Sequence, residues 1–305
     1  MTNGRLVRKD IDALSNLEPE ALRKLRDAYA RMMQIVDYRG YNYWAGIHGT
    51  PQYYCWHSPR PPGQGGRRDW WHPSLRLNYD LWLPWHRAYL LYFENYLRDQ
   101  DPDVGLPWWD WSSNRSLEVG VPAAFSAEEV DGQSNPLYKA YIRATDYVPV
   151  NQREQFDRDT FYSPDRPSEL RRKLLEVIEK TIGNMNADRP VSDRLIMALR
   201  SIRQFEGGSG FSATLRDIHD HIHLWTGGDM ASVGTAAYVP IFWSHHSMID
   251  RIWYLWQIEN GPNNIPVDHL PVVLQPFGLT VSDVLDIAAL GYEYAVSEVV
   301  VGGPG

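Results

Sequence analysis

The chain has 305 residues, enough for one large domain with a substantial core. Its formal net charge of -8 disfavours nucleic acids and anionic membrane surfaces as partners, because both require clustered Lys and Arg. No run of about 18 uncharged apolar residues occurs, so no membrane span is expected and a small-molecule partner is favoured.

The chain opens on charged rather than apolar sequence, so no signal peptide is expected. A single cysteine, Cys55, excludes a disulfide within the chain. We therefore expect a cytoplasmic protein, with secretion left open if a leader was trimmed.

Apolar residues at helical spacing predict a series of helices, the second starting at Pro84 and the last stopped by Gly261 and Pro262. Residues 40–68 are rich in Gly and Pro and are predicted to be a loop. Extended segments are few, as at 296–301, and no βαβ rhythm is present. The prediction is a mainly α domain with long loops and few short strands. In chain order, the predicted helices span residues 17–37, 84–100, 168–183, 191–202, 212–225 and 240–260.

Histidines cluster on the last two predicted helices. His219 and His223 are four residues apart and share one helix face, which is a chelating geometry. His246 and Asp250 have the same spacing, so the carboxylate could orient a histidine ring from behind. His245 points about 100° away from His246, so only one of the two is expected to bind the same metal.

The type of ligand limits which metal ions this site can be expected to bind. A lone buried histidine is usually only packed and hydrogen-bonded, but His48, His57 and His86 add further histidine-bearing segments. Abundant imidazole without thiolate clusters favours Zn, Cu, Fe or Ni. A zinc hydrolase is one alternative, since the segment starting at His219 is close to HExxH, but Asp220 is one carbon shorter than the Glu base of that motif.

Three motifs resemble those of the type 3 copper proteins, which include tyrosinases, catechol oxidases and haemocyanins. Residues 82–94 resemble F-L-P-W-H-R-x-x-L-x-x-x-E, with Trp82 in place of Phe. Residues 219–230, HDHIHLWTGGDM, resemble H-N-x-x-H followed by Gly-Gly-x-Met. Residues 240–253 resemble P-x-F-x-x-H-H-x-x-x-D-R. The resemblance is to the tyrosinase (polyphenol oxidase) type and covers roughly residues 8–294.

The resemblance implies a four-helix bundle core that holds a dinuclear copper site. His48 and His86 would bind the first copper, together with either His57 or His72. Cys55-Trp56-His57 favours His57, because some members link such a cysteine to the ligand ring by a thioether; Cys55 as a small buried hydrophobe stays open. The second copper would be bound by His219, His223 and His246.

The implied activity uses O2 to hydroxylate monophenols at the ortho position, to oxidise o-diphenols to o-quinones, or both. Asp220 stands where tyrosinases usually carry Asn, which leaves a catechol oxidase or o-aminophenol oxidase open. Glu206 is a candidate partner of Asp220 in positioning a water, although its offset from His219 is long. Val233 stands at the position that controls access to the second copper. A haemocyanin-like O2 carrier is less favoured, because such carriers usually form very large assemblies.

The tyrosine motif ending at Tyr294 closes the catalytic core of the family, and Arg8 is its candidate cation–π or hydrogen-bond partner. We expect a catalytic domain at 1–294 and a tail or linker remnant at 295–305, without a C-terminal shielding domain. Small phenols are the expected partners, and both a homo-oligomer and a copper-delivery protein stay open.

Overall fold

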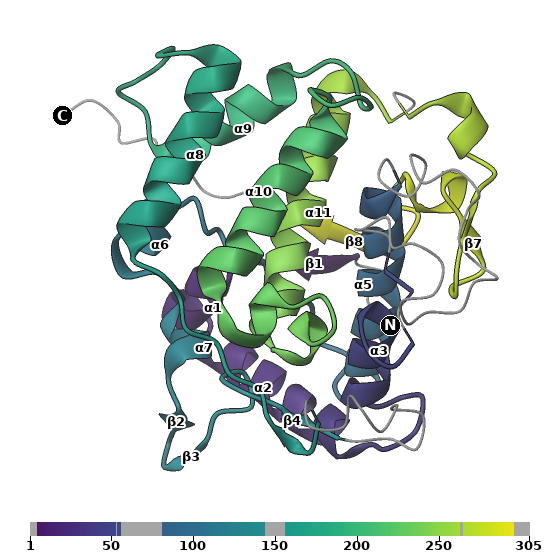
Figure 1. The fold of residues 1–305 in the computed structure, drawn as a ribbon. Helices are drawn as coiled ribbons and strands as arrows, with labels where there is room; N and C mark the ends of the chain where they lie inside the picture. The colour runs from purple at the N-terminus through teal and green to yellow at the C-terminus, as the bar shows by residue number, and fades with distance from the viewer. Residues whose placement is uncertain (1–4, 53, 56–80, 144–155, 263–264, 296–305) are drawn as a thin grey trace.

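A computed structural model describes residues 5–52, 54–55, 81–143, 156–262 and 265–295. Helices dominate the described chain, as Figure 1 shows, which confirms the mainly α prediction. The helices are α1 (Ile11–Leu17), α2 (Pro19–Gln34), α3 (Tyr41–His48), α5 (Trp82–Arg98), α6 (Asn114–Val119), α7 (Ala123–Ser126), α8 (Pro167–Ile182), α9 (Val191–Ser201), α10 (Phe211–Thr226) and α11 (Ile241–Asn260), with short 3-10 turns η3 (Gly228–Ala231), η4 (Ala236–Tyr238), η5 (Val267–His269) and η6 (Ser282–Val284).

The centre of the molecule is built on α3, α5, α10 and α11. Helix α11 packs against α5 and α9, and α3 packs against η4 and α2 (Figure 1). Most positions of α5 and α11 are buried on all sides, which is typical of helices inside a core rather than on its surface. These four helices carry every histidine that is discussed below as a metal ligand within the described residues.

The amphipathic helices cover this core. In α2 the buried positions are Leu22, Leu25, Ala28, Tyr29 and Met32, at the spacing that the sequence predicted. The predicted helix at 17–37 corresponds to α2, which starts at Pro19. A separate helix that was not predicted, α1, precedes it and is capped by Asp10 through the backbone amides of Asp12 and Ala13.

Strands are short, as predicted, and pair two by two. Among the described strands, the pair that joins the most distant parts of the chain is β1 (Leu6–Arg8) with β8 (Tyr292–Tyr294), in parallel register with Leu6 opposite Tyr292 and Arg8 opposite Tyr294. The other pairs are antiparallel: β2 (Glu129–Val130) with β3 (Gln133–Ser134), β4 (Tyr141–Ile142) with β5 (Arg158–Asp159), and β6 (Val273–Leu274) with β7 (Leu279–Thr280).

The sequence did not predict four short helices, α1, α3, α6 and α7. Residues 40–68 were expected to be a loop, but α3 occupies Tyr41–His48 at its start. Eight residues are too few for a helix that is stable alone, so α3 depends on the burial of Tyr41, Trp44 and Ile47 in the core. The predicted strand at 296–301 lies outside the described residues. Among the helices that the structure describes, none has the length and apolarity needed to cross a bilayer.

Candidate metal centre

Three imidazoles from α10 and α11 converge on one point. The Nε2 atoms of His219 and His223 lie 3.0 Å apart, and each lies 3.3 Å from Nε2 of His246. Three nitrogens bound to one metal at about 2 Å would be about 3.3 to 3.6 Å apart. The triangle therefore matches a metal site with little adjustment of the rings.

Oxygen acceptors fix the orientation of two of these rings. Nδ1 of His223 donates to the carbonyl of Met230 at 2.8 Å, and Nδ1 of His219 donates to the Asp220 carboxylate at 2.9 Å. A ring that donates from Nδ1 keeps its lone pair on Nε2, where a metal would bind.

The Gly-Gly-x-Met motif explains how the Met230 carbonyl reaches His223. A Cβ on Gly227 would lie 2.6 Å from the Ser163 carbonyl oxygen, and one on Gly228 would lie 2.5 Å from that of Phe161. Both glycines also have positive φ, 70° and 54°. Only glycine allows the chain to turn this tightly after α10.

The next residues anchor this turn. The Asp229 carboxylate, 3 % exposed, accepts from Arg158 Nη2 at 2.6 Å and from the Phe161 backbone amide at 2.9 Å. The ion pair ties the turn to β5, and so holds the carbonyl that orients His223.

A second histidine group lies beside the first. His48 ends α3, His86 lies in the first half of α5, and donor atoms of His48, His86 and His246 all lie within 4.8 Å of one another. Nδ1 of His86 donates to the Trp82 carbonyl at 2.7 Å, and the backbone of Val233 lies close to the His48 ring. The rings of His86 and His246 stack at 4.5 Å. Two adjacent half-sites are thus formed by α3 and α5 on one side and by α10 and α11 on the other.

The remaining predicted ligands cannot be placed. His57 and His72 lie outside the described residues, so the choice between them, and the thioether, stays a prediction. Cys55 itself is described and is buried.

Burial keeps these imidazoles neutral. It lowers the pKa of His86 to about 3 and that of His223 to about 4, and it holds the pKa values of His48, His219 and His246 well below the ordinary range. Neutral imidazole is the form that binds metals. A buried, all-imidazole donor set on two adjacent half-sites fits copper well.

His245 lies behind the second half-site. Its ring is fully buried and stacks on His219 at 5.2 Å with an interplanar angle of 20°. Its donor atoms lie within the group that contains His219, His223 and His246, but Nε2 of His246 makes the short contacts with the two α10 histidines. This geometry favours His246 over its neighbour as the ligand.

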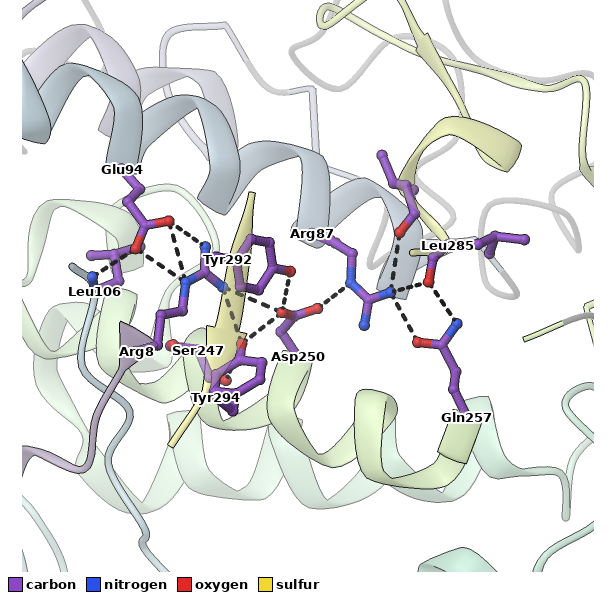
Figure 2. A network of polar contacts seen from close by, with 11 residues as sticks. Arg8, Arg87, Glu94, Leu106, Ser247, Asp250, Gln257, Leu285, Tyr292 and Tyr294 are labelled. Atoms are coloured by element: carbon purple, nitrogen blue, oxygen red, sulfur yellow. Dashed lines mark hydrogen bonds and ion pairs between the residues drawn. The ribbon is translucent and has the colours of Figure 1, made fainter. Parts of the chain in front are cut away.

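Asp250 differs from the sequence expectation. Among the described residues, its carboxylate binds no histidine ring and instead accepts from Arg87 Nε at 2.5 Å and from Tyr292 and Tyr294 hydroxyls at 2.7 and 2.6 Å (Figure 2). Arg8 Nη1 lies 3.3 Å from the same carboxylate. Two guanidinium groups attract an ionised carboxylate more strongly than a neutral imidazole does, so Asp250 turns away from His246.

Arg8 is the partner of the tyrosine motif, as the sequence predicted. Its guanidinium lies 3.7 Å above the Tyr292 ring centroid and donates to the Tyr294 hydroxyl at 3.0 Å. Arg8 also donates to Glu94 at 2.8 Å, and Glu94 accepts from the Leu106 amide at 2.7 Å (Figure 2). Although burial raises the pKa of Asp250, Arg87 and Arg8 hold it below its usual value.

Glu206 lies elsewhere than expected. Oε1 of its carboxylate lies 3.2 Å from Nε2 of His269, and among the described residues no contact with a metal-site histidine is seen. It precedes the turn that starts α10, and His219 follows eight residues after Phe211, about 12 Å along the helix. Asp220, by contrast, contacts His219 directly, and its side chain is 56 % exposed at the edge of the site.

Sequence reasoning missed the backbone carbonyls of Trp82 and Met230 as groups that orient histidine rings. Only the first carries a sequence signal, since Trp82 precedes His86 by four residues, the spacing at which a helix carbonyl meets a side chain.

Comparisons with known proteins agree with this geometry. The family model of the common central domain of tyrosinase matches residues 38–259. A tyrosinase of Streptomyces antibioticus is 33% identical over 185 residues, which cover 57% of this chain and 62% of that protein. Hemocyanin 1 of Megathura crenulata is 29% identical over 278 residues, 89% of this chain but 7% of that protein. The structure of an oxygen-bound mutant of Aspergillus oryzae pro-tyrosinase superposes with a TM-score of 0.69 at 20% identity, covering 97% of this chain and 70% of that one, which shows the shared fold. The chain thus spans less than two thirds of the first of these relatives.

Proposed function

The chain belongs to the tyrosinase family, and on this premise we propose that it is a dinuclear copper oxidase that acts on small phenols with O2. The observation that supports this most directly is the triangle of Nε2 atoms beside a second histidine group, both fully buried.

In this proposal His48 and His86 hold the first copper, with His57 as their third ligand and His72 as the alternative. His219, His223 and His246 hold the second copper. When bound, the two ions supply O2 binding and electron transfer. The protein supplies orientation: the carbonyls of Trp82 and Met230 and the carboxylate of Asp220 each fix one ring so that Nε2 faces the metal.

Access to the centre is proposed to pass Val233. This residue is half-buried, packs against the hydrophobic core, and has its backbone close to His48. Gly49 packs against the same segment, where a Cβ would lie 2.3 Å from the Gly234 oxygen. The backbone of the segment is therefore held in place while the Val233 side chain can be changed. A Val233→Phe variant should raise KM for phenols several-fold with copper content unchanged.

Asp220 supports a second candidate, a catechol oxidase or o-aminophenol oxidase without monophenolase activity. Its carboxylate only accepts hydrogen bonds when ionised and is already bound to Nδ1 of His219. This leaves less capacity to position a water that would deprotonate a phenol. Asp220→Asn should then raise the ratio of monophenol to diphenol turnover, and an unchanged ratio would argue against any role of Asp220 in this choice.

The deciding experiment measures copper per chain together with O2 consumption on tyrosine and on the matched o-diphenol. Two coppers with both substrates oxidised establish a tyrosinase, and oxidation of the diphenol alone establishes a catechol oxidase. Reversible O2 binding without turnover of either phenol would favour an oxygen carrier, and tightly bound zinc without copper would contradict the proposal. An oligomer and a copper-delivery protein stay predictions.

A further inference from the structure

His245 is a buried histidine that has no ligand position in the proposed copper centre. Its ring is fully buried on α11, and among the described residues neither of its ring nitrogens has a hydrogen-bond partner. A neutral imidazole carries one N–H donor and one acceptor nitrogen, and each is unfavourable when it is buried and unpaired. Phenylalanine or leucine would fill the same space without this cost, so packing alone does not account for a histidine here.

The ring of His245 lies against the second half-site. Its centroid lies 5.2 Å from that of His219, on which it stacks, and 4.8 Å from that of His223, with the two planes nearly perpendicular at 87°. The donor atoms of these three histidines and of His246 all lie within 4.8 Å of one another. His245 therefore adds a fourth imidazole to a group that already contains three proposed ligands.

Distances distinguish the fourth imidazole from the other three. Two nitrogens that bind one metal ion at about 2.1 Å are at most about 4.2 Å apart. The Nε2 atoms of His219, His223 and His246 satisfy this limit, at 3.0 and 3.3 Å, whereas the group of four is bounded only by 4.8 Å. Three nitrogens are thus placed to bind one ion together, and the fourth lies close enough to replace one of them with little movement.

The burial of the half-site gives such a replacement a purpose. The three ligand histidines are at most 9 % exposed, so water has little access to an ion that loses one of these rings. An ion with a missing ligand inside an apolar core is unfavourable, and a spare imidazole at the same place reduces this cost.

From these observations we propose that His245 is an exchange ligand. It binds the second copper transiently while one of the three permanent ligands is released, both when the ion is loaded and when it is removed. The inference rests on the proposed function.

An exchange ligand and a packing residue predict opposite results. A group that acts only on the path between free and bound ion changes the rates of uptake and release by the same factor and leaves the equilibrium affinity unchanged. A group that holds the ligand rings in place stabilises the bound state, so its loss weakens the affinity and speeds release. The two rates, measured together, therefore distinguish the two roles.

The test compares His245→Leu with His245→Met. The two replacements are close in volume, but Met alone offers a thioether sulfur, a ligand that suits Cu(I). Each metal-free protein is mixed with Cu(I) held by a weak chelator, and the loaded protein is then mixed with a strong chelator. Copper per chain, the rates of uptake and release, and the affinity are measured.

His245→Leu should still bind two coppers with wild-type affinity. One of the two should enter and leave about 10-fold more slowly, which corresponds to a barrier about 1.4 kcal/mol higher. His245→Met should recover most of both rates, because it restores a donor atom for Cu(I).

Two controls separate the donor atoms from the packing. Ile249→Val changes a buried residue on the same face of α11, one turn after His245, and should keep the wild-type rates. The first copper is an internal control, because the group of donor atoms formed by His48, His86 and His246 does not include His245. Its rates should be the same in all variants.

Wild-type rates in His245→Leu, equal slowing in His245→Met, or faster release with weaker affinity would each overturn the inference and leave the copper oxidase proposal intact. If His245→Leu cannot be obtained folded, His245→Phe replaces it, because a phenyl ring retains the stacking on His219 and removes both nitrogens. A wild-type chain that binds no copper would overturn both.

Discussion

Helices α5 and α11 carry two buried polar clusters. The two clusters offset the unfavourable free energy of burying polar groups in different ways. The metal centre uses neutral imidazoles, whose pKa values burial lowers, among them His86 at about 3. The network around Asp250 uses full charges, in which Arg8 and Arg87 surround one carboxylate (Figure 2). In the first case the buried side chains are kept uncharged, and in the second the positive and negative charges compensate one another.

The two clusters are close in sequence: on α5 their members are adjacent residues, and on α11 they are one helical turn apart. His86 faces the metal centre while Arg87 faces Asp250, and His246 precedes Asp250 by four residues. Changes at adjacent positions should therefore have different consequences, for activity in one case and for folding in the other.

The largest expected effect is on activity, from His223→Ala. Removing one member of the Nε2 triangle should reduce copper from two ions to about one per chain and reduce phenol oxidation to background, because both ions are needed. Unfolding of the copper-free protein should lose about 1 to 3 kcal/mol, because the change leaves a small cavity and an unpaired Met230 carbonyl, and this is less than the loss expected when a buried charge is left unpaired. Copper analysis and urea titration of the metal-free form check both parts, and a variant that keeps two coppers would contradict the ligand assignment.

Asp250→Asn should give the largest loss of stability. The guanidinium groups of Arg8 and Arg87 would stay buried with one fewer negative charge, which typically costs about 3 to 5 kcal/mol. Urea unfolding of the metal-free protein measures this cost. A decrease in the free energy of unfolding below about 1 kcal/mol would show that Glu94 and the hydroxyls of Tyr292 and Tyr294 are sufficient to stabilise the guanidinium groups of Arg8 and Arg87.

A smaller effect depends on pH and concerns Asp10. Burial and the nearby Asp110 raise the pKa of Asp10 to about 6 from its ordinary 3.8. Between these values the folded state holds a proton that the unfolded state has lost, so the free energy of unfolding falls as pH rises from about 4 to about 6.

Asp10→Asn keeps a good N-cap for α1 but removes this charge. The variant should melt about 3 °C higher than wild type at pH 8, and this advantage should disappear near pH 4. A difference in melting temperature that does not depend on pH would contradict the titration of Asp10.

The smallest effect is expected from Arg23→Ala. Arg23 pairs with Glu20 and Asp27 on the exposed face of α2, and its side chain is 58% exposed. Such exposed pairs contribute little to stability and weaken with salt. The same urea titration, repeated at high salt, checks this; a loss comparable to that of Asp250→Asn would remove the distinction between surface and buried pairs.

The local sequence pattern was sufficient to predict most of the helices that carry the candidate metal ligands. The helices that carry His86, His219, His223 and His246 follow from apolar spacing together with Pro84 and the Gly261 stop, and the spacing of four between His219 and His223 puts both on one face. The partnership of Arg8 with the tyrosine motif also followed from the sequence.

Contacts between distant segments could be decided only by the tertiary structure. Helix α3 is too short to be read from periodicity and forms because the core buries it. The spacing from His246 to Asp250 was read correctly as one face, but the side chain turned to two arginines that lie 163 and 242 residues away in sequence. Glu206 likewise contacts His269, a residue that is distant in sequence and that only the fold brings close to it. A sequence pattern reports which face of an element a residue occupies, whereas the partner on that face is chosen by charge and packing among elements that only folding brings together.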